Sequence, residues 1–306
     1  MHRNDKELTI IVLTYYSAHL IKECLSKLDF DSYKIIVIDN SSQDNTVGIV
    51  QENFPLAEII KLKKNIGYGN ANNVALEQTN TDFALILNPD AFISKEDIEK
   101  ILAVMKSNNR IALAGPLLFD TYPATPDIIE TRINAINKDI TGLKKFFYTK
   151  LSDHCYSGAF IWGCISFMNM KVFREIGFFD NNIFLYWEDN ELSDRVVKHG
   201  YINALMTHSH GYHIAGKSSQ KSLRILYLRS WHLAWSRLYL HRTRHRFILS
   251  KIYSIPLTLQ NFVKFLVSVL ILDAETTVRY LGATSGSFSF LIGLKAVKKN
   301  GAPSEQ

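Results

Sequence analysis

The sequence predicts an α/β fold, a doubly wound and mostly parallel sheet followed by C-terminal amphipathic helices. Apolar runs of strand length alternate with segments of helical spacing over roughly the first hundred residues. One run, Phe83–Leu87, is unbroken, which is typical of a strand buried on both faces of a parallel sheet. Polar side chains follow four of the expected strands, at Thr14, Asp39, Asn65 and Asp90.

The expected elements follow one another along the chain. Strands are predicted at 8–13, 34–38, 59–62, 83–87, 111–114, 157–161 and 164–168. Helices are predicted at 18–28, after Asp44, after Asn65, at 95–106 with Ser94 as N-cap, at 171–176 ended by Gly177, and from Glu188 to His199 with Gly200 as C-cap. The polar segment 120–150 reads as a variable excursion and a candidate lid.

Composition narrows the class of protein. With 306 residues and 47% hydrophobic content, the chain can bury one large domain and an appendage. Its three cysteines are widely spaced and form no CxxC pair, which favours a reducing compartment over a disulfide framework or a zinc site. The polar N-terminus leads directly into a strand, so we expect no signal peptide.

The net charge of +6 is unevenly distributed. The segment from Arg195 to Leu272 holds twelve Lys and Arg residues and no acidic residue, so the rest of the chain has 23 basic and 29 acidic residues, a net charge of −6. The basic character therefore belongs to one segment and calls for its own explanation.

Polar groups at the carboxyl ends of parallel strands indicate a nucleotide site, because open α/β sheets bind ligands there. A dinucleotide-binding fold is the competing interpretation. It fails because Asn72 stands where the third glycine after Gly67 and Gly69 should be, and because the pair follows the third strand, not the first.

A second cluster lies at residues 184–189. Phe184, Tyr186 and Trp187 precede Glu188 and Asp189 at the expected start of a helix. Acidic residues there have a general explanation in the helix dipole. The adjacent aromatic residues favour a sugar site instead, because aromatic faces pack on pyranose rings while carboxylates bind hydroxyls.

Taken in order, the motifs resemble those of family 2 glycosyltransferases, which have the GT-A fold. The closest branch is the rhamnosyltransferase-like and galactofuranosyltransferase-like one, and the resemblance covers residues 8–218. The motifs are Thr14-Tyr15, Ile38-Asp39-Asn-Ser-Ser, Asn65-x-Gly-Tyr-Gly, Leu87-Asn88-Pro-Asp90, Gly177-Phe-Phe-Asp180, Tyr186-x-Glu-Asp189-x-Glu-Leu-x-x-Arg195 and His213-x-x-Gly-x-Ser218.

The resemblance implies roles for the matching residues. Asp39 would accept a hydrogen bond from the pyrimidine of a UDP- or dTDP-sugar, and Thr14 and Tyr15 would line its base and ribose. Asn65, Asn73 and Asn88 would lie along the nucleotide cleft, Asp90 with His213 would bind Mg²⁺ or Mn²⁺, and Asp189 would be the catalytic base. Apart from the resemblance, Tyr186 and Trp187 are expected to bind the acceptor. Glu188 is the second expected catalytic carboxylate, assigned to hydrogen bonding of the acceptor or the helix end, and the reverse assignment of Glu188 and Asp189 stays open.

Two positions depart from the family pattern. Tyr16 stands where Asn is common, and Asn88 replaces the first Asp of the D-x-D motif. A hard cation needs only one or two protein carboxylates when substrate phosphates complete its shell. His213 also has an alternative reading, in which His208, His210 and His213 cap a loop.

The C-terminal third interleaves basic and large apolar residues, a pattern suited to amphipathic helices on an anionic membrane. Nucleic acid is the alternative for such a segment, but no recognised nucleic-acid motif is present. Residues 252–272 are apolar yet contain Pro256, Gln260, Asn261 and Lys264, which favours an in-plane or shallow re-entrant helix over a spanning one. A homo-oligomer interface is the competing interpretation.

The expected organisation is a transferase domain at 1–218, a basic helical membrane-association or oligomerisation region at 219–300, and a disordered tail at 301–306. The expected function is inverting, metal-dependent sugar transfer to a glycan or lipid-linked acceptor, such as O-antigen or capsule, at the cytoplasmic face of the plasma membrane. L-Rhamnose from dTDP-rhamnose is the first expectation for the donor. A galactofuranosyl or other UDP-sugar transferase, and a non-catalytic nucleotide-sugar-binding scaffold, are the alternatives.

Overall fold

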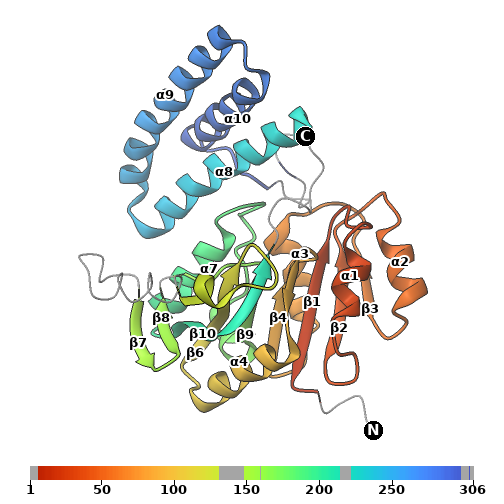
Figure 1. The fold of residues 1–306 in the computed structure, drawn as a ribbon. Coiled ribbons are helices and arrows are strands. Elements are labelled where there is room, and N and C mark those ends of the chain that lie inside the picture. The colour runs from red at the N-terminus through yellow and green to blue at the C-terminus, as the bar shows by residue number, and fades with distance from the viewer. Residues whose placement is uncertain (1–5, 131–147, 159, 214–221, 298–302, 304–306) are drawn as a thin grey trace. The chain divides into compact units, whose positions relative to one another are not determined.

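The computed structural model describes residues 6–130, 148–158, 160–213, 222–297 and 303, and Figure 1 shows their order along the chain. The chain divides into two compact units. The first unit comprises Met1–Lys63, Asn72–Phe178 and Leu192–Ser219, and the second comprises Lys64–Ala71, Phe179–Glu191 and Gln220–Gln306. The boundaries expected at residues 218 and 300 stay a prediction.

In the first unit, ten strands of the described chain form one sheet in the order β3-β2-β1-β4-β9-β6-β10-β8-β7, with β5 paired to β10. The strands are β1 (Leu8–Thr14), β2 (Lys34–Asp39), β3 (Glu58–Lys61), β4 (Phe83–Leu87), β5 (Ala91–Ile93), β6 (Ile111–Phe119), β7 (Tyr148–Ser152), β8 (Cys155–Gly158), β9 (Ile165–Asn169) and β10 (Ile202–His213). The part from β3 to β4 is wholly parallel. The predicted doubly wound α/β fold is confirmed.

β4 lies at the centre of this sheet and has the bounds that its apolar run predicts. All five of its side chains are buried. It pairs parallel with β1 on one side and antiparallel with β9 on the other. Pro89 has no amide hydrogen to continue the ladder, so the strand ends before it. The turn Asn88–Asp90 therefore leaves the sheet at the carboxyl end of a rigid, fully packed strand (Figure 1).

The helices of the first half are α1 (Ile21–Ser26), α2 (Thr46–Asn53), α3 (Tyr68–Glu77), α4 (Lys95–Ser107), α6 (Met170–Ile176) and α7 (Glu188–Lys198). Two predicted ends are confirmed. The Ser94 hydroxyl accepts a hydrogen bond from the Asp97 amide at 3.1 Å, as an N-cap does. Gly177, with φ of 86°, ends α6 in the left-handed region that glycine adopts without strain.

Several parts of the sheet differ from the sequence prediction. β5 and β7 were not predicted, and the strand expected at 157–161 is β8, which spans Cys155–Gly158. β6 does not end at Gly115-Pro116 but continues to Phe119. Pro116 is tolerated there because it lies opposite Met206, where the register with β10 shifts. β10 itself was not predicted, and the alternative that its histidines cap a loop is wrong, because the strand runs from Ile202 to His213.

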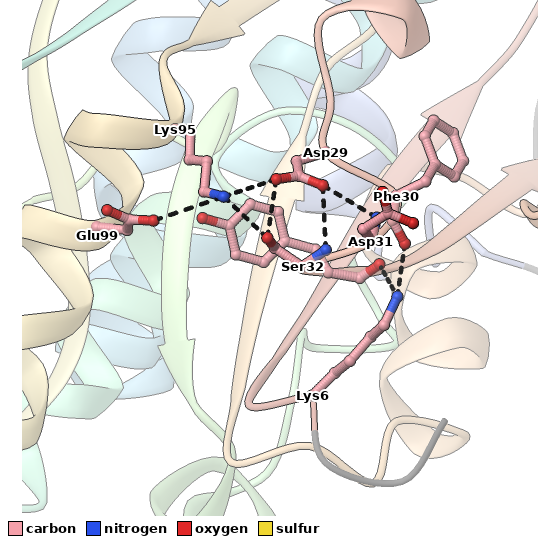
Figure 2. Close-up of polar contacts among 8 residues, drawn as sticks. Lys6, Asp29, Phe30, Asp31, Ser32, Lys95 and Glu99 are labelled. Atoms are coloured by element: carbon pink, nitrogen blue, oxygen red, sulfur yellow. Dashed lines mark hydrogen bonds and ion pairs between the residues drawn. The ribbon is translucent and has the colours of Figure 1, made fainter. Parts of the chain in front are cut away.

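Figure 2 shows polar contacts that join the start of α4 to the loop between α1 and β2. Lys95 Nζ lies 2.7 Å from Asp29 Oδ2 and 2.9 Å from the Ser32 hydroxyl. The hydrogen bond from Lys95 holds the pKa of Asp29 well below its usual range. Lys6 Nζ donates to the Phe30 carbonyl at 2.5 Å. Because Lys95 is exposed, solvent screens its ion pair with Asp29, so the contacts fix the loop more than they stabilise the fold.

The second unit contains three long helices, α8 (Leu223–Arg244), α9 (Phe247–Ile271) and α10 (Ala274–Leu291). Figure 1 shows α9 and α10 as a hairpin, and α8 and α9 each pack mainly against α10. Trp231, Trp235 and Leu238 of α8 and Phe290 of α10 form a buried apolar cluster. The predicted C-terminal helices are thus confirmed.

Close packing of α10 on α8 depends on two glycines. A Cβ on Gly282 would lie 2.4 Å from the Tyr227 carbonyl oxygen, and one on Gly286 would lie 2.2 Å from the Trp231 carbonyl oxygen. Contacts that short do not occur, so any side chain would force the helices apart. The spacing of four residues places both glycines on one face of α10, as in small-residue contacts between helices.

Most of the expected excursion at 120–150 and of the tail at 301–306 lies outside the described residues. Those two predictions therefore stay untested.

Candidate functional site

At the carboxyl ends of β1 and β2, Thr14 and Asp39 lie together. The Thr14 hydroxyl donates to Asp39 Oδ1 at 3.1 Å, and the backbone amide of Ser42 donates to Asp39 Oδ2 at 3.0 Å. Both residues are fully buried. Each carboxylate oxygen has two lone pairs, so each keeps one after these bonds. In the present conformation the carboxylate organises the loops after the two strands, and its predicted contact with a base stays a prediction.

The loop after β1 holds two tyrosines in different environments. Tyr16 adopts φ of 54° and its amide donates to the Ser42 hydroxyl at 2.9 Å. Ser41, with φ of 71°, is also left-handed. Such residues cost on the order of 1–3 kcal/mol and occur where the surroundings fix them. Tyr15 is 45% exposed and lies edge-on to Tyr16, which leaves its ring accessible to a ligand.

The two asparagines predicted to line the nucleotide cleft, Asn65 and Asn73, lie in different structural environments. The Asn65 side-chain oxygen accepts the Gly67 amide at 2.9 Å, which shapes the turn before the helix. Asn73 is buried within α3. Asn65 belongs to the second unit and Asn73 to the first.

The turn after β4 is held by the loop before β9. The Asn88 amide donates to the Cys164 carbonyl at 2.9 Å, and the Ala91 amide donates to the Asn88 carbonyl at 3.0 Å. Two backbone bonds therefore fix the residues on either side of Asp90. β5 then starts at Ala91 and pairs antiparallel with β10.

This pairing brings Asp90 and His213 together, as the sequence motifs predicted for a shared site. Ala91 lies opposite His213 in the ladder, and His213 Nε2 is 3.2 Å from Asp90 Oδ1. The Asp90 side chain is only 2% exposed; its Oδ1 faces the His213 ring nitrogen, and its Oδ2 has no hydrogen-bond partner among the described residues. The adjacent Asp90 carboxylate, with a smaller contribution from Cys164, raises the pKa of His213 to about 10.

A buried carboxylate that has one imidazole beside it and one oxygen without a partner suits a cation. Carboxylate oxygen and imidazole nitrogen are both ligands for Mn²⁺, and a carboxylate suits Mg²⁺. The described residues contain no group of three or more His, Cys, Asp or Glu that could hold a metal ion alone. Asp90 and His213 therefore fit an ion that takes its remaining ligands from water or a bound phosphate.

Glu188 and Asp189 open α7 in contrasting states. Glu188 is buried, and its Oε2 has no hydrogen-bond partner among the described residues. Burial, together with the neighbouring Asp189 charge, raises the pKa of Glu188 to about 8. Asp189 is half-buried, and its Oδ1 accepts the Asn190 amide at 2.9 Å. Adjacent carboxyl groups in different environments can take different roles in proton transfer.

The two aromatic residues before α7 are held in unusual conformations. Tyr186 and Trp187 have φ of 66° and 68°, the left-handed region that bulky residues rarely adopt. Arg229 donates from Nε to the Tyr186 hydroxyl, which fixes that ring. The Trp187 indole N–H is buried without a partner among the described residues. A hydroxyl of a bound sugar would give that donor an acceptor.

Three contributors were missed by the sequence reading. Ser42 supports both Asp39 and Tyr16, Cys164 contacts the turn at Asn88, and Arg229 anchors Tyr186. Ser42 lies within a motif that was recognised, so its position could have indicated its role. Cys164 and Arg229 lie far along the chain from their partners, and no local pattern marks them.

The sequence model of Glycosyl transferase family 2 matches residues 9–177, more than half of the chain. The chain belongs to this family. It is therefore a glycosyltransferase, as the motifs predicted.

Two curated relatives of this glycosyltransferase are rhamnosyltransferases. An N-acetylglucosaminyl-diphospho-decaprenol L-rhamnosyltransferase of Mycobacterium tuberculosis is 22% identical over 268 residues, covering 75% of this chain and 86% of the relative. The O-antigen chain rhamnosyltransferase RfbN of Salmonella typhimurium is 24% identical over 216 residues, covering 67% of each.

A solved structure shows the same fold. The mannosyltransferase PcManGT of Pyrobaculum calidifontis, in complex with GDP-Man and Mn²⁺, aligns with a TM-score of 0.58 and 14% identity over 94% of this chain and 87% of that one. The expected GT-A fold is thereby confirmed.

Proposed function

We propose that this glycosyltransferase catalyses metal-dependent, inverting transfer of a sugar from a nucleoside-diphosphate donor to a glycan or lipid-linked acceptor in cell-surface polysaccharide synthesis. The observation that carries the proposal is Asp90, a buried carboxylate at the end of β4 whose Oδ1 faces His213 and whose Oδ2 has no hydrogen-bond partner among the described residues. The Mn²⁺ in the related PcManGT structure supports the choice of cation.

Asp90 and His213 would hold Mg²⁺ or Mn²⁺ together with the donor diphosphate. The ion supplies Lewis-acid stabilisation of the departing phosphate charge. The adjacent Asp90 carboxylate raises the pKa of His213, so metal binding at the imidazole would release a proton. The hydrogen bond from the Asn88 amide to the Cys164 carbonyl would help to hold Asp90 in place.

The donor would lie against the ends of β1, β2 and β4. Tyr15, which is exposed, would pack on the base. Thr14 and Asp39 would order the surrounding loops, and the Asp39 carboxylate would offer its remaining lone pairs to the base. Asn65, Asn73 and Asn88 would contribute polar contacts to the nucleotide. dTDP-rhamnose is the proposed donor, and the names of the two rhamnosyltransferase relatives support it.

Asp189 would accept the proton of the acceptor hydroxyl. The acceptor oxygen forms a bond to the anomeric carbon as the bond from that carbon to the phosphate oxygen breaks, and the nucleoside diphosphate leaves. One displacement inverts the anomeric centre. Glu188, which holds a proton at neutral pH, would donate a hydrogen bond, and Tyr186 and Trp187 would contact the acceptor ring.

The test compares Asp189→Asn with Glu188→Gln in single-turnover transfer at saturating donor. Asn cannot take a proton, so the rate should fall by about 10²–10⁴-fold while donor binding is retained. Glu188→Gln should cost less, because Gln keeps a hydrogen-bond donor in place of the protonated carboxyl. A larger loss in Glu188→Gln than in Asp189→Asn would make Glu188 the base.

The acceptor would be reached at the cytoplasmic face of the plasma membrane, with which we propose that the enzyme associates peripherally. One helix of the described chain, Phe247–Ile271, is long and apolar enough to cross a membrane by length and composition, with a mean hydropathy of 1.5. The basic residues of the preceding segment would favour the anionic leaflet.

A further inference from the structure

The outward face of α9 is mostly apolar, with Gln260 and Lys264 as exposed polar residues. Fourteen of its 25 residues are large hydrophobic side chains that are between 36% and 82% exposed. Ile248, Ile252, Ile255, Leu259 and Phe262 recur at intervals of three or four residues, which aligns them along one side of the helix. A soluble protein rarely exposes so large a continuous apolar surface.

The inward face of α9 is polar instead. Ser250, Ser254 and Ser268 are the residues of this helix that are buried, and they repeat at spacings that place them on one side. Asn261, on the same side, donates from Nδ2 to the Ser287 hydroxyl of α10 at 3.3 Å. Small and polar side chains thus lie on the inward face of α9, beside Leu257, which packs against the apolar cluster that contains Phe290 of α10.

This distribution is the reverse of that in a water-soluble helix, which buries its apolar side. It matches helices surrounded by lipid, where small and polar residues join the helices and apolar residues face outward. A second protein copy would account for the exposed apolar side chains, but not for serines and an asparagine at the helix contact. The pattern therefore favours acyl chains as the occupant.

Charge at the start of α9 points to the same occupant. Arg242, Arg244 and Arg246 are exposed immediately before the apolar face, and the Arg242 guanidinium lies 5.2 Å from the Phe247 ring centroid. Basic residues beside an apolar helix face match the headgroup and acyl layers of an anionic membrane.

The charges on the neighbouring helices limit how the α9–α10 hairpin can enter a membrane. α10 packs against α8, which carries Arg224, Arg229 and Arg237, and the turn before α10 carries Asp273. Immersing all three helices would take these charges out of water, which is unfavourable. The apolar residues of the outward face of α9 can enter the hydrocarbon without that cost if the helix lies along the membrane plane, where Lys264 on its long side chain can reach the headgroups.

We propose that α9 is an inside-out helix whose outward face lies in the acyl-chain layer of an anionic phospholipid membrane. The inference deepens the peripheral association proposed above, and it rests on the second unit alone, independent of the donor site.

A probe of depth tests it. Leu259→Cys, labelled with an environment-sensitive fluorophore, is compared with Leu56→Cys in the full chain, since the two leucines are 60% and 57% exposed. The three native cysteines are buried, which confines labelling to the new thiol. With phosphatidylcholine–phosphatidylglycerol vesicles, the Leu259 probe should shift to the blue and be quenched by acyl-brominated lipid, whereas the Leu56 probe should remain unchanged.

Two results would overturn the proposal. In the first, the emission of the Leu259 probe stays at its value in water while the protein binds vesicles. In the second, the emission shifts to the blue without lipid as protein concentration rises, which would identify a second copy as the occupant. Donor binding is measured on the same samples. A failed depth result with intact donor binding refutes only this inference, while absent donor binding refutes the proposed function.

A second set of variants measures affinity. Leu259→Asp and Leu266→Asp should each weaken vesicle binding by about tenfold or more, because each places a charge where an exposed aliphatic chain would enter the acyl layer. Leu56→Asp is the matched control and should bind like the wild type. Because these side chains are exposed, melting temperatures without lipid should stay the same. Equal binding by all three variants would contradict the assignment of this face.

Discussion

Asp90 and Glu188 are both carboxylates that the fold removes from water, and their neighbours set opposite outcomes. Beside Asp90 stands His213, whose pKa rises to about 10, so that pair carries opposite charges at neutral pH. Beside Glu188 stands another carboxylate, and burial raises its pKa to about 8. The Asp90–His213 pair can therefore release a proton when a cation binds, whereas Glu188 retains its proton and can donate a hydrogen bond.

The raised pKa of Glu188 predicts a pH-dependent stability. Unfolded Glu loses its proton near pH 4.3, whereas folded Glu188 keeps its proton to about pH 8. Between these values the native state binds more protons, so the free energy of unfolding falls as pH rises. Glu188→Gln removes this dependence and should raise the melting temperature more at pH 8.5 than at pH 5, by about 2–4 °C per kcal/mol recovered.

Thermal melts across that range provide the measurement, with Glu52→Gln, an exposed residue of α2, as the control. A Glu188→Gln variant that changes stability equally at both pH values would show that Glu188 is ionised in the folded protein.

At the scale of elements, local signals predicted well. The apolar run of β4, the Ser94 cap and the glycine after α6 are each determined by neighbouring residues, and each was found where expected. β10 was not predicted, because its polar and histidine-rich sequence becomes a strand only through pairing with β5, β6 and β8. The contacts of Cys164 and Arg229 depend on tertiary packing in the same way, as does the burial of Asp39.

Packing of α10 on α8 gives a prediction at this scale. Gly286→Ala places a Cβ 2.2 Å from the Trp231 carbonyl oxygen, which is too close, so the helices must separate. The cost of overpacking, about 1–3 kcal/mol, should exceed the gain in helix propensity of about 1 kcal/mol. Denaturant unfolding measures the difference. Ser285→Ala, one residue earlier on α10, is the control, and equal stability of both variants would contradict the described contact.

At the scale of the whole molecule, basic and acidic residues are concentrated in different parts of the chain. The basic segment from Arg195 to Leu272 accounts for the positive net charge, while the rest of the chain is acidic. A protein that used its basic charge only for solubility would have no reason to gather it beside an apolar helix. The distribution favours a membrane partner for one part of the chain and a nucleotide for another.

Charge reversal at Arg242, Arg244 and Arg246 to Glu tests the membrane partner. Each basic residue near an anionic surface contributes about 1 kcal/mol, so the loss of three should weaken vesicle binding by roughly 100-fold. Co-sedimentation with phosphatidylglycerol vesicles measures it. The same reversal at Lys22, Lys106 and Lys171, which are exposed in the first unit, is the control. Equal sedimentation of both triple variants would favour an oligomer interface instead.

The central claim is that Asp90 binds the metal that holds the donor diphosphate. The most direct measurement is a thermal-shift titration of nucleoside-diphosphate sugars with and without Mn²⁺, on the wild type and on Asp90→Ala. Stabilisation grows with ligand concentration relative to Kd. The melting temperature of the wild type should therefore rise only when donor and Mn²⁺ are both present. Asp90→Ala should lose the Mn²⁺-dependent part and all transfer activity. Wild-type activity of Asp90→Ala in EDTA would contradict the account.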